Sequence, residues 1–444
     1  MYSVYLYHNE DEFLRALKEN DVSSNPYQKY SFYKFFLKYN KNNISYFYNI
    51  YDSQKQLVAI IPMECTFEST FFKVRILRFI GYRQYNYEQY ICDDSKVEEV
   101  HQTFIDYLKN DVVSTVINYY DINNQSELYR ILNNEKFCIG SNSLYGCPVV
   151  ELDGNFDDFF KRLFSSSKKR AELKKFQNRL IDTGQIELIN IYNSETYKKY
   201  GFLIKDIYRV HKERFARVYS TSFFSSDNMR NYYDELLRST LNSGDAYLSM
   251  IVLDGVVIAF ILCLANTTTL IDWIPAFDPA FAKYNLGTVQ YKMLFEQLCE
   301  DKQYKYFDYS KGSSIYKRKW AKSETTNYQF TVRIKDNLSS LIFSNLMKIF
   351  FAFKSFLREK GVLSKTKHLL GALKNIDKKN ENQNSKISIQ KMPYSESLQK
   401  CAYSELVKLP VVERKQVLDY MYNGYFVTHV DNKKNNTIIY ISKK

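Results

Sequence analysis

Two apolar runs near the middle of the chain are separated only by Asp254 and Gly255. Long β-branched runs on either side of an Asp-Gly pair predict a β-hairpin with a tight turn. A third apolar run, a turn containing Gly287, a helical pattern and a short strand-like run follow. The predicted elements are strands over 247–253, 256–265 and 269–277, a helix over 289–300 and a strand over 305–310.

The first third of the chain shows a similar alternation of strand-like and helical patterns. Asn9, followed by acidic residues, marks the start of a helix after a short first strand. Apolar residues recur at helical spacing over 96–109. The remaining runs are strand-like and lie at 46–67, which includes a hairpin, at 74–82 and at 112–122.

The alternation of strand-like and helical patterns restarts after residue 147. After residue 333 the pattern of the sequence becomes different. The predicted elements before the central hairpin are a strand over 148–154, one or two helices within 155–184, a strand over 186–193, and helices over 197–219 and 228–245. A polar, charged stretch over 374–386 contains no aromatic residue and is predicted to be a flexible linker. The last segment, 387–444, is predicted to contain helices and a hairpin, and we assign it no function.

The pattern therefore predicts an α/β (α+β) protein of several parts. With 444 residues and 45% hydrophobic content, the chain is long enough for two or three domains with real cores. The predicted parts are two halves over 1–147 and 148–333, an amphipathic helical segment over 334–373, the linker over 374–386 and a small module over 387–444.

The chain is basic, with 62 Lys and Arg against 49 Asp and Glu and a formal charge of +13. Positive charge favours anionic partners such as a CoA phosphate, a nucleotide sugar, acidic lipid headgroups or nucleic acid. Charge alone does not choose among these partners, and an AT-rich genome also produces a Lys-, Asn- and Tyr-rich composition.

The seven cysteines are scattered, with no Cys-x-x-Cys spacing and no nearby pair of histidines. The sequence therefore predicts neither a metal site nor a disulfide framework, and we expect reduced thiols in a cytoplasmic protein. The N-terminal stretch lacks a basic region followed by an apolar core, so no secretory signal is predicted.

Three stretches, in this order and at this spacing, resemble the GNAT-type acyltransferases associated with cellulose and exopolysaccharide synthesis, and more distantly the Fem-type peptidoglycan aminoacyltransferases. The stretches are LDGVVIAFIL (253–262), AFDPAFAKYNLGT (276–288) with the helix after it, and YFDYSKGSSIYKRKW (306–320). The resemblance implies two tandem GNAT-like mixed-sheet halves, of which the first is degenerate, followed by the helical tail and the small C-terminal module.

In this superfamily the turn before the helix holds the pyrophosphate of acetyl-CoA or another acyl-CoA. A glycine lets the backbone approach the anion, and the unpaired N–H groups of the first helical turn point toward it. By position, the residues implied are Asn285, Leu286, Gly287 and Thr288. The family pattern has Gln or Arg where this chain has Tyr284, and a second small residue where it has Val289, so another acyl donor remains open.

GNAT folds also splay two strands so that a backbone N–H meets the thioester carbonyl. Because proline cannot donate to a strand ladder, Pro275 is predicted to mark where pairing stops. This places the thioester near residues 272–276 and makes Ile274 a predicted donor-binding residue.

Acyl transfer also requires a base for the acceptor and a proton source for the departing thiolate. Asp308 matches an Asp of the family and is the first-choice base, and Asp272 is the second; a structural role for either carboxylate remains open. The resemblance implies that Tyr316 protonates the thiolate and that Lys317 stabilises negative charge, although the family often has an acidic residue where this chain has Ser313.

Further residues are predicted to bind substrate. Lys311 and Trp320 flank the predicted catalytic residues, and Arg170 and Lys174 lie i,i+4 on a basic helix face that could hold a phosphate or could simply be solvated. The weaker candidates, each with an ordinary structural alternative, are Tyr85, Tyr87 and Glu88 on the acceptor side and His211 as a base, for which a surface position is the alternative.

The segment 338–358 has an apolar side and a polar side and is a poor membrane span. It is predicted either to lie on the inner membrane face as a peripheral contact or to pack on the protein's own body. The function expected from the whole sequence is an acyl-CoA-dependent N- or O-acyltransferase, first of all an acetyltransferase, acting on a sugar, nucleotide sugar or lipid-linked glycan, with no nucleic acid partner. A Fem-type aminoacyl-tRNA-dependent transferase and a non-catalytic GNAT-like module of a polysaccharide-synthesis complex remain as alternatives.

Overall fold

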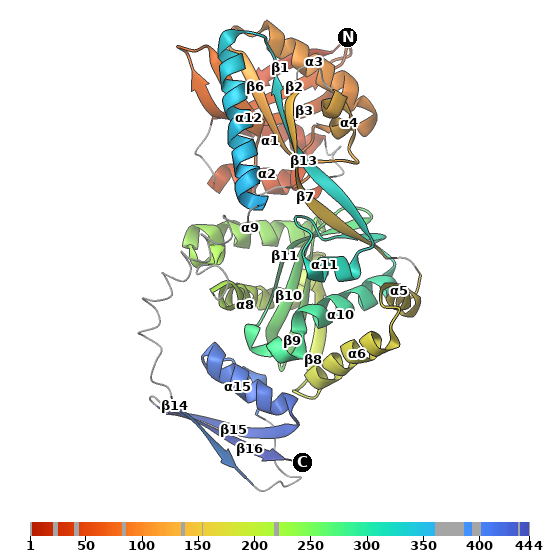
Figure 1. The fold of residues 1–444 in the computed structure, drawn as a ribbon, viewed down its shortest axis with the longest axis vertical. Coiled ribbons are helices and arrows are strands. Elements are labelled where there is room, and N and C mark those ends of the chain that lie inside the picture. Colours follow the sequence, from red (N-terminus) through yellow and green to blue (C-terminus); the bar gives the residue numbers. More distant parts are fainter. Residues whose placement is uncertain are drawn as a thin grey trace. The chain divides into compact units, whose positions relative to one another are not determined.

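The computed structural model describes residues 2–20, 25–39, 44–81, 86–134, 138–152, 154–216, 222–359, 386–392, 401–433 and 436–443. The chain divides into two compact units, each formed from separate stretches of sequence (Figure 1). Unit 1 consists of Met1–Val150, Tyr232–Ser239 and Asp308–Val362, and unit 2 consists of Glu151–Asn231, Thr240–Phe307 and Leu363–Lys444.

Unit 1 is built on a mixed sheet. Its strands follow the order β1 (Ser3–Tyr7), β2 (Ile44–Tyr51), β3 (Leu57–Ser69), β4 (Val74–Phe79), β6 (Ser114–Asn123), β13 (Ser323–Arg333) and β7 (Cys138–Glu151), with the short β5 (Ile91–Cys92) beside β3. Strands β4 and β6 are parallel, and the other neighbours in this order are antiparallel.

Helices cover both faces of the unit 1 sheet. They are α1 (Glu10–Glu19), α2 (Tyr30–Tyr39), α3 (Val97–Asn110), α4 (Glu127–Asn134) and α12 (Leu338–Glu359); the short α11 (Ile315–Trp320) also belongs to unit 1. On β6, Ile117 packs in the core shared with α3, whereas its neighbour Val116 belongs to a small cluster against which Phe343 of α12 packs. Because successive strand residues point to opposite faces, α3 and α12 lie on opposite sides of the sheet.

Unit 2 contains the predicted central hairpin. Its main strands follow the order β12 (Tyr306–Asp308), β11 (Thr269–Phe277), β10 (Val256–Ala265), β9 (Ala246–Leu253) and β8 (Ile186–Ile191). The helices are α5 (Phe156–Leu163), α6 (Ser167–Ile181), α7 (Ser194–Tyr200), α8 (Ile204–Ala216), α9 (Asp227–Ser243) and α10 (Leu286–Asp301). Every residue of β9 is buried, which agrees with its continuous apolar run.

The C-terminal residues form a small module within unit 2. Its elements are β14 (Lys386–Lys391), α14 (Tyr403–Leu406), α15 (Val411–Tyr422), β15 (Tyr425–Lys433) and β16 (Asn436–Lys443). Apolar residues of this module share one core with the short helical segment Pro279–Tyr284 and with the start of α10. The module therefore packs directly on the segment that leads into α10.

A buried polar network joins the module to that segment. The Arg414 side chain, fully buried, forms ion pairs with Asp278 (Nε to Oδ2, 3.1 Å) and with Glu213 of α8 (Nη2 to Oε2, 2.5 Å). Tyr403 donates its hydroxyl proton to Asp278, which also accepts the N–H of Ala280. We call these four side chains, Glu213, Asp278, Tyr403 and Arg414, the Asp278 network.

The predicted mixed α/β class and the central order of elements are confirmed. Helix α10 begins at Leu286, not at Val289, because the preceding turn is only one residue long. Strand β13 and residues 308–322 belong to unit 1, since β13 pairs with β6 and β7. Of the predicted tail and linker, residues 360–385 lie outside the described part of the chain, and Lys386 begins β14.

Candidate functional site

The start of α10 is formed by a single residue in the left-handed conformation. Asn285, with φ 49° and ψ 38°, ends the short helical segment and begins α10. The N–H groups of Thr288 and Val289 bond back to the Asn285 carbonyl at 2.8 and 3.1 Å, and no side chain caps the helix. The first N–H groups of α10, those of Leu286 and Gly287, therefore point out of the helix end, which is the arrangement that binds anions.

Gly287 lies against an aromatic side chain. A Cβ atom at this position would come within 2.8 Å of the Phe277 ring, so the close approach requires glycine. The Arg214 guanidinium lies 4.3 Å from the centroid of the same ring. A cation from α8 and the first turn of α10 thus both lie beside Phe277, and the residues present fit a phosphate-bearing donor.

The four predicted donor residues do not contribute equally. The Leu286 side chain is fully buried, so Leu286 offers only its backbone. The Thr288 hydroxyl donates to the Asn285 side chain at 2.8 Å. Tyr284, the departure from the family pattern, is buried and donates its hydroxyl proton to the Leu418 carbonyl at 2.8 Å, which explains why a large side chain replaces Gln or Arg there.

The predicted parting of strands at Pro275 is wrong for the ladder with β10. Pro275 lies opposite Ile261, and pairing continues to Phe277 opposite Ala259. The irregularity falls earlier, where the register shifts between Leu262 and Cys263. Pro275 is tolerated because a missing N–H matters only at a position that donates to the ladder. Ile274 is buried opposite Leu262, so its donor-binding role stays a prediction without support from this ladder.

Asp272 lies in the core of unit 2. Its side chain is 4% exposed and accepts a hydrogen bond at 2.7 Å from the Tyr291 hydroxyl on α10. The bond ties β11 to α10 on the side away from solvent. This geometry favours the structural alternative for Asp272.

Asp308 is held differently, at the end of β12. Its Oδ2 accepts the Tyr87 hydroxyl proton at 2.6 Å, and its Oδ1 accepts the Ser310 N–H at 2.7 Å. Burial raises the pKa of Asp308 above its ordinary value, while these two hydrogen bonds and the charge of Lys317 oppose the rise. A carboxylate whose pKa is raised is a better base near neutral pH.

Two more carboxylates lie near Asp308 in unit 1. Lys311 Nζ forms an ion pair at 2.8 Å with Oδ2 of Asp121, which is fully buried on β6. Burial, followed by the charge of Asp121, raises the pKa of Glu88 well above its ordinary value. One Glu88 oxygen accepts the Tyr120 N–H at 3.1 Å, and the other has no hydrogen-bond partner among the described residues. We call these residues, Tyr87, Glu88, Asp121, Asp308 and Lys311, together with Ser310 and the Asn86 that donates to its hydroxyl, the Asp308 cluster.

The backbone of the Asp308 cluster is strained at three points. Tyr87, Asp121 and Ser310 have φ values of 60°, 60° and 55°. Residues with side chains rarely adopt this region, and a bulky residue there is a genuine outlier. Strain of this kind persists where the surroundings enforce it, and it gathers at functional sites.

The remaining residues near Asp308 fall into structural and exposed groups. Lys317 Nζ donates to the carbonyls of Tyr309 (2.6 Å) and Lys311 (2.8 Å) and so fixes the loop that carries Lys311. Tyr316 is exposed on α11. Trp320 is 1% exposed, which does not fit the predicted contact with substrate, because an indole in the core cannot line an open site.

The residues of the predicted basic face and the candidate histidine lie in different environments. Arg170 donates to the carbonyls of Phe164 and Ser165 and thereby caps the end of α5, whereas Lys174 is exposed. The surface position expected for His211 is wrong: it is 1% exposed among phenylalanine rings, and burial lowers its pKa to about 4. Tyr85 lies outside the described residues.

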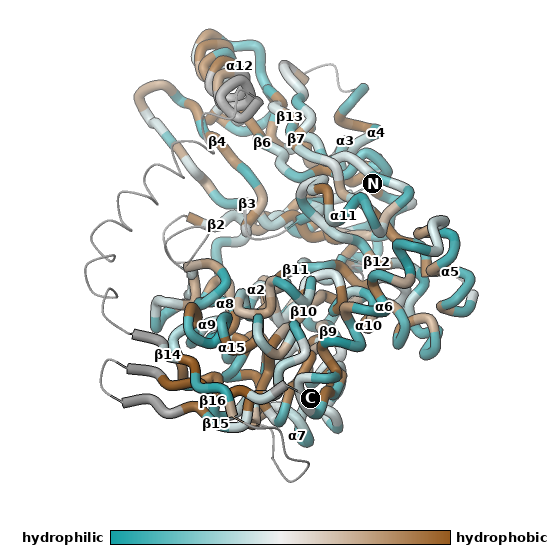
Figure 2. Tube along the Cα trace, turned by 60° about the horizontal axis from the view of Figure 1, so that its bottom comes forward, coloured by the Kyte–Doolittle hydropathy of each residue, from teal (hydrophilic) through white to brown (hydrophobic). Residues whose placement is uncertain are grey.

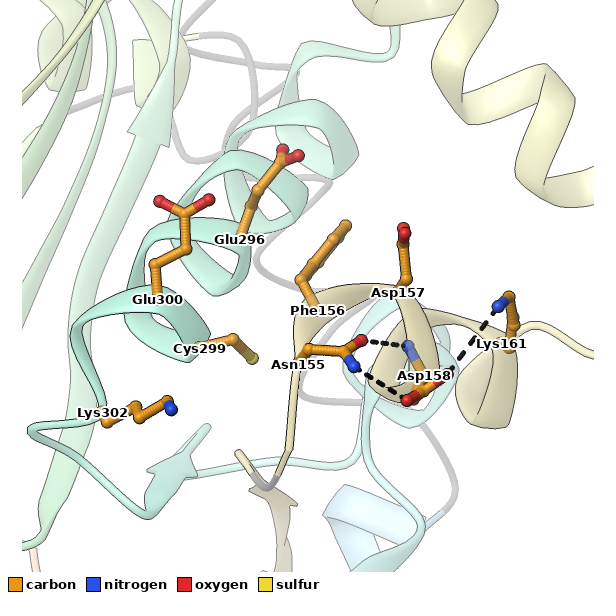
Figure 3. A pocket seen from close by; sticks show the side chains of 9 residues that line it. All are labelled: Asn155, Phe156, Asp157, Asp158, Lys161, Glu296, Cys299, Glu300 and Lys302. Atoms are coloured by element: carbon orange, nitrogen blue, oxygen red, sulfur yellow. Dashed lines mark hydrogen bonds and ion pairs between the residues drawn. The ribbon is translucent and has the colours of Figure 1, made fainter.

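A depression of about 550 Å³ lies at the opposite end of α10 (Figure 3). Glu296 and Glu300 line it from α10, and Asp157 and Asp158 line it from the start of α5. The four carboxylates outnumber the two lysines of the lining, Lys161 and Lys302, and Glu296 and Glu300 lie toward the negative end of α10, which together disfavour a phosphate group. This depression is therefore not a suitable donor site.

Sequence reasoning missed Asp121, Asn86 and Arg214. Asn86 donates to the Tyr27 hydroxyl (2.9 Å) and to the Ser310 hydroxyl (2.5 Å), contacts that join distant parts of the sequence. Only Asp121 carried a signal, because a carboxylate in the middle of a buried strand run is rare without a partner.

Comparison with known proteins agrees with the central part of this description. Residues 167–318 match the family model described as Acetyltransferase (GNAT) domain. No curated protein sequence matches the chain.

Three solved structures have a similar fold at low similarity. L-PGS from Bacillus licheniformis is 14% identical, with 76% of this chain and 96% of that chain covered and a TM-score of 0.44. FemX is 9% identical (74% and 96% covered, TM-score 0.44), and a tandem GNAT protein from the clavulanic acid biosynthesis pathway is 9% identical (76% and 100% covered, TM-score 0.40). Similarities at this level identify no substrate. The segment that matches the GNAT acetyltransferase model, residues 167–318, contains β9 to β12 and the start of α10.

Proposed function

We propose that this protein is an acyl-CoA-dependent N- or O-acyltransferase, first of all an acetyltransferase, that acts on a sugar, nucleotide sugar or lipid-linked glycan in cell-surface polysaccharide synthesis. The observation that carries the proposal is the helix start at Gly287, which no side chain caps, inside the segment that matches the GNAT model. A diphosphate is the ligand that such a helix end favours.

In this proposal the donor supplies an activated thioester, and unit 2 binds its diphosphate. The backbone N–H groups at Leu286 and Gly287 would bind phosphate oxygens, and Arg214 would add a positive charge across the Phe277 ring. Asn285 holds the turn open through its left-handed backbone and its bond from Thr288. These residues orient the donor and do not take part in proton transfer.

Asp308 is proposed to accept the proton of the acceptor amine or hydroxyl. Tyr87 fixes one carboxylate oxygen and the Ser310 amide fixes the other, so the orientation of the group is set before substrate binds. Lys311, whose charge is held by the buried Asp121, is proposed to contact a polar acceptor. Tyr316, exposed on α11, is retained as the proposed proton donor to the thiolate.

The proposed site of action is the cytoplasmic side of the inner membrane, where nucleotide sugars and lipid-linked glycans meet. None of the helices in the described part of the chain is both long and apolar enough to cross a membrane. The alternatives are a Fem-type transferase that uses aminoacyl-tRNA and a non-catalytic module of a polysaccharide-synthesis complex.

Thermal denaturation with candidate ligands tests the donor assignment. A ligand that binds only the folded protein raises its melting temperature. We expect acetyl-CoA to raise it and acetyl-pantetheine, which lacks the diphosphate, to have no effect. A rise with aminoacyl-tRNA and none with any acyl-CoA would favour the Fem-type alternative.

A Gly287→Ala variant tests the same site through the protein. The added methyl group would lie 2.8 Å from the Phe277 ring and would displace that ring toward the helix end. We expect acetyl-CoA to bind about tenfold more weakly, a cost of about 1.4 kcal/mol, with a melting temperature near that of the wild type, since alanine favours a helix. Gly201→Ala, at a similar junction of two helical segments in unit 2, is the matched control. Equal acetyl-CoA affinity in both variants would contradict the assignment.

A further inference from the structure

Helix α12 exposes its apolar side and buries its small polar side. Ser340 and Ser344 are fully buried, and their hydroxyls donate to carbonyls of the same segment, those of Asn337 (3.0 Å) and Leu341 (3.0 Å) respectively. The exposed stripe has helical spacing and consists of Leu338 (73% exposed), Ile342 (49%), Leu346 (56%), Ile349 (66%) and Phe353 (59%). This is the reverse of a helix that is stabilised by packing on its own protein.

The β3–β4 hairpin extends this apolar surface. Phe71 is 86% exposed and Phe72 is 48% exposed at the tip of the hairpin, and their rings are 4.9 Å apart. Phe343 of α12 lies 5.7 Å from the Phe72 ring and 5.1 Å from the Phe67 ring, so the hairpin and the helix lie side by side. Figure 2 shows hydrophobic residues along α12. A continuous exposed patch of this kind marks an interaction site.

The charges around the patch are unequal. Each of its carboxylates has an arginine partner, because Arg75 pairs with both Glu68 (3.0 Å) and Asp111 (3.1 Å), and Arg333 pairs with Asp336 (2.6 Å). Lys73 at the hairpin tip and Lys348 on α12 are exposed, and no carboxylate partner is recorded for either among the described residues. The surface that remains is apolar with positive charges beside it.

We propose that the α12 stripe and the Phe71–Phe72 tip bind the surface of an anionic lipid bilayer, with α12 lying in the membrane plane. Two exposed phenylalanines on a hairpin tip and a stripe of large aliphatic side chains, with lysines at the edge, match the chemistry of an interface between acyl chains and acidic headgroups. The helix is about 33 Å long and lies flat on its unit. A protein partner would need carboxylates near Lys73 and Lys348, and a second copy of this chain offers the same positive charges, which repel.

Vesicle co-sedimentation with the full chain tests the proposal. We expect the protein to bind vesicles of phosphatidylcholine with 30% phosphatidylglycerol, to bind pure phosphatidylcholine at least tenfold more weakly, and to lose affinity as salt is raised. Equal binding to both compositions, or no binding to either, would overturn the proposal.

Substitutions at exposed positions connect the binding to the patch. Phe71→Ser and Ile349→Ser remove apolar groups that do not contribute to the core, so the melting temperature should stay unchanged. Each should weaken binding to the anionic vesicles about tenfold, because a large apolar side chain no longer enters the bilayer. The matched control is Phe202→Ser, which removes a 65% exposed phenylalanine of unit 2 and should bind as the wild type does.

Self-association gives the competing outcome. If the wild type were a concentration-dependent dimer in sedimentation velocity, and if Ile349→Ser made it monomeric without changing vesicle binding, the patch would be an interface between copies and the proposal would fail. If vesicles bound only after deletion of residues 360–385, those residues would occupy the patch in the full chain, and the proposal would fail for the intact protein.

Discussion

The Asp308 cluster in unit 1 and the Asp278 network in unit 2 both hold buried carboxylates beside a cation. They differ in how many of their polar atoms have a hydrogen-bond partner. In the Asp278 network, Arg414 pairs with both carboxylates, Arg209 also pairs with Glu213, and a tyrosine and a backbone amide donate to Asp278; Arg414 Nε contacts Asp278 as an ion pair without a hydrogen bond. In the Asp308 cluster, one oxygen of Glu88 and the side-chain oxygen of Asn86 have no hydrogen-bond partner among the described residues. Three residues there also have left-handed backbones.

This difference distinguishes carboxylates that stabilise the fold from carboxylates that can still accept a hydrogen bond or a proton. Buried polar groups are normally paired, since an unpaired one costs free energy, so an exception requires an explanation. Asp278 contributes its charge to holding the C-terminal module in place. The Asp308 cluster keeps acceptor capacity that a substrate can use, which is why we assign proton transfer to it and not to the better-packed network.

The largest expected effect is on turnover. Asp308→Asn keeps the shape of the side chain and can still accept the Ser310 N–H, but it removes the base, so the acyl-transfer rate should fall by about 10² to 10⁴-fold. The melting temperature should stay close to that of the wild type. Asp272→Asn is the matched control, and we expect it to lower the melting temperature with a smaller change in rate. A rate that Asp308→Asn leaves unchanged would remove the proposed base.

The Asp278 network can be broken at its cation. Arg414→Met leaves the buried Asp278 without a positive partner, while Glu213 keeps its pair with Arg209 (3.4 Å), and the free energy of unfolding should fall by about 3 to 5 kcal/mol. Urea denaturation measures this loss. Arg230→Met removes a surface arginine that pairs with Asp227, and the loss there should stay below about 1 kcal/mol. Similar losses for the two variants would show that the Asp278 network does not stabilise the protein.

The loss of stability at low pH provides a further test of unit 2 through His211, which lies two residues before Glu213 on α8. Burial lowers the pKa of His211 to about 4, so the folded protein keeps it neutral while the unfolded chain binds a proton below about 6.5. The unfolded state then holds more protons, and stability falls as pH drops from 6.5 to 4, by about 3 kcal/mol at most. His211→Asn should flatten this part of the curve in urea denaturation series. An unchanged slope in the variant would assign the acid sensitivity to other groups.

Local patterns predicted the parts of the fold that depend on local chemistry. The Asp254-Gly255 turn and the apolar runs around it define β9 and β10, and Asn9 caps α1 through bonds from the N–H groups of Asp11 and Glu12. The loop around Gly287 was recognised because glycine and the following helix form a local motif.

Long-range pairing was not predictable in the same way. Asp121 and Lys311 meet because β6 and β13 pair across two hundred residues of sequence, a register that no local pattern contains. Arg414 lies on α15, where polar and apolar residues show no clear helical face, so nothing marked it as buried. His211 was placed at the surface because its helix carries charged neighbours, although the phenylalanines that bury it, Phe215, Phe223 and Phe224, follow it closely in sequence.

The position of Arg414 has a consequence for how this protein can be cut into fragments. The segment that matches the acetyltransferase model ends at residue 318, yet the countercharge of its Asp278 is supplied almost a hundred residues later. An expression fragment chosen from that match would carry the buried Asp278 without its arginine. The smallest fragment with an intact donor turn must therefore include the last elements of the chain.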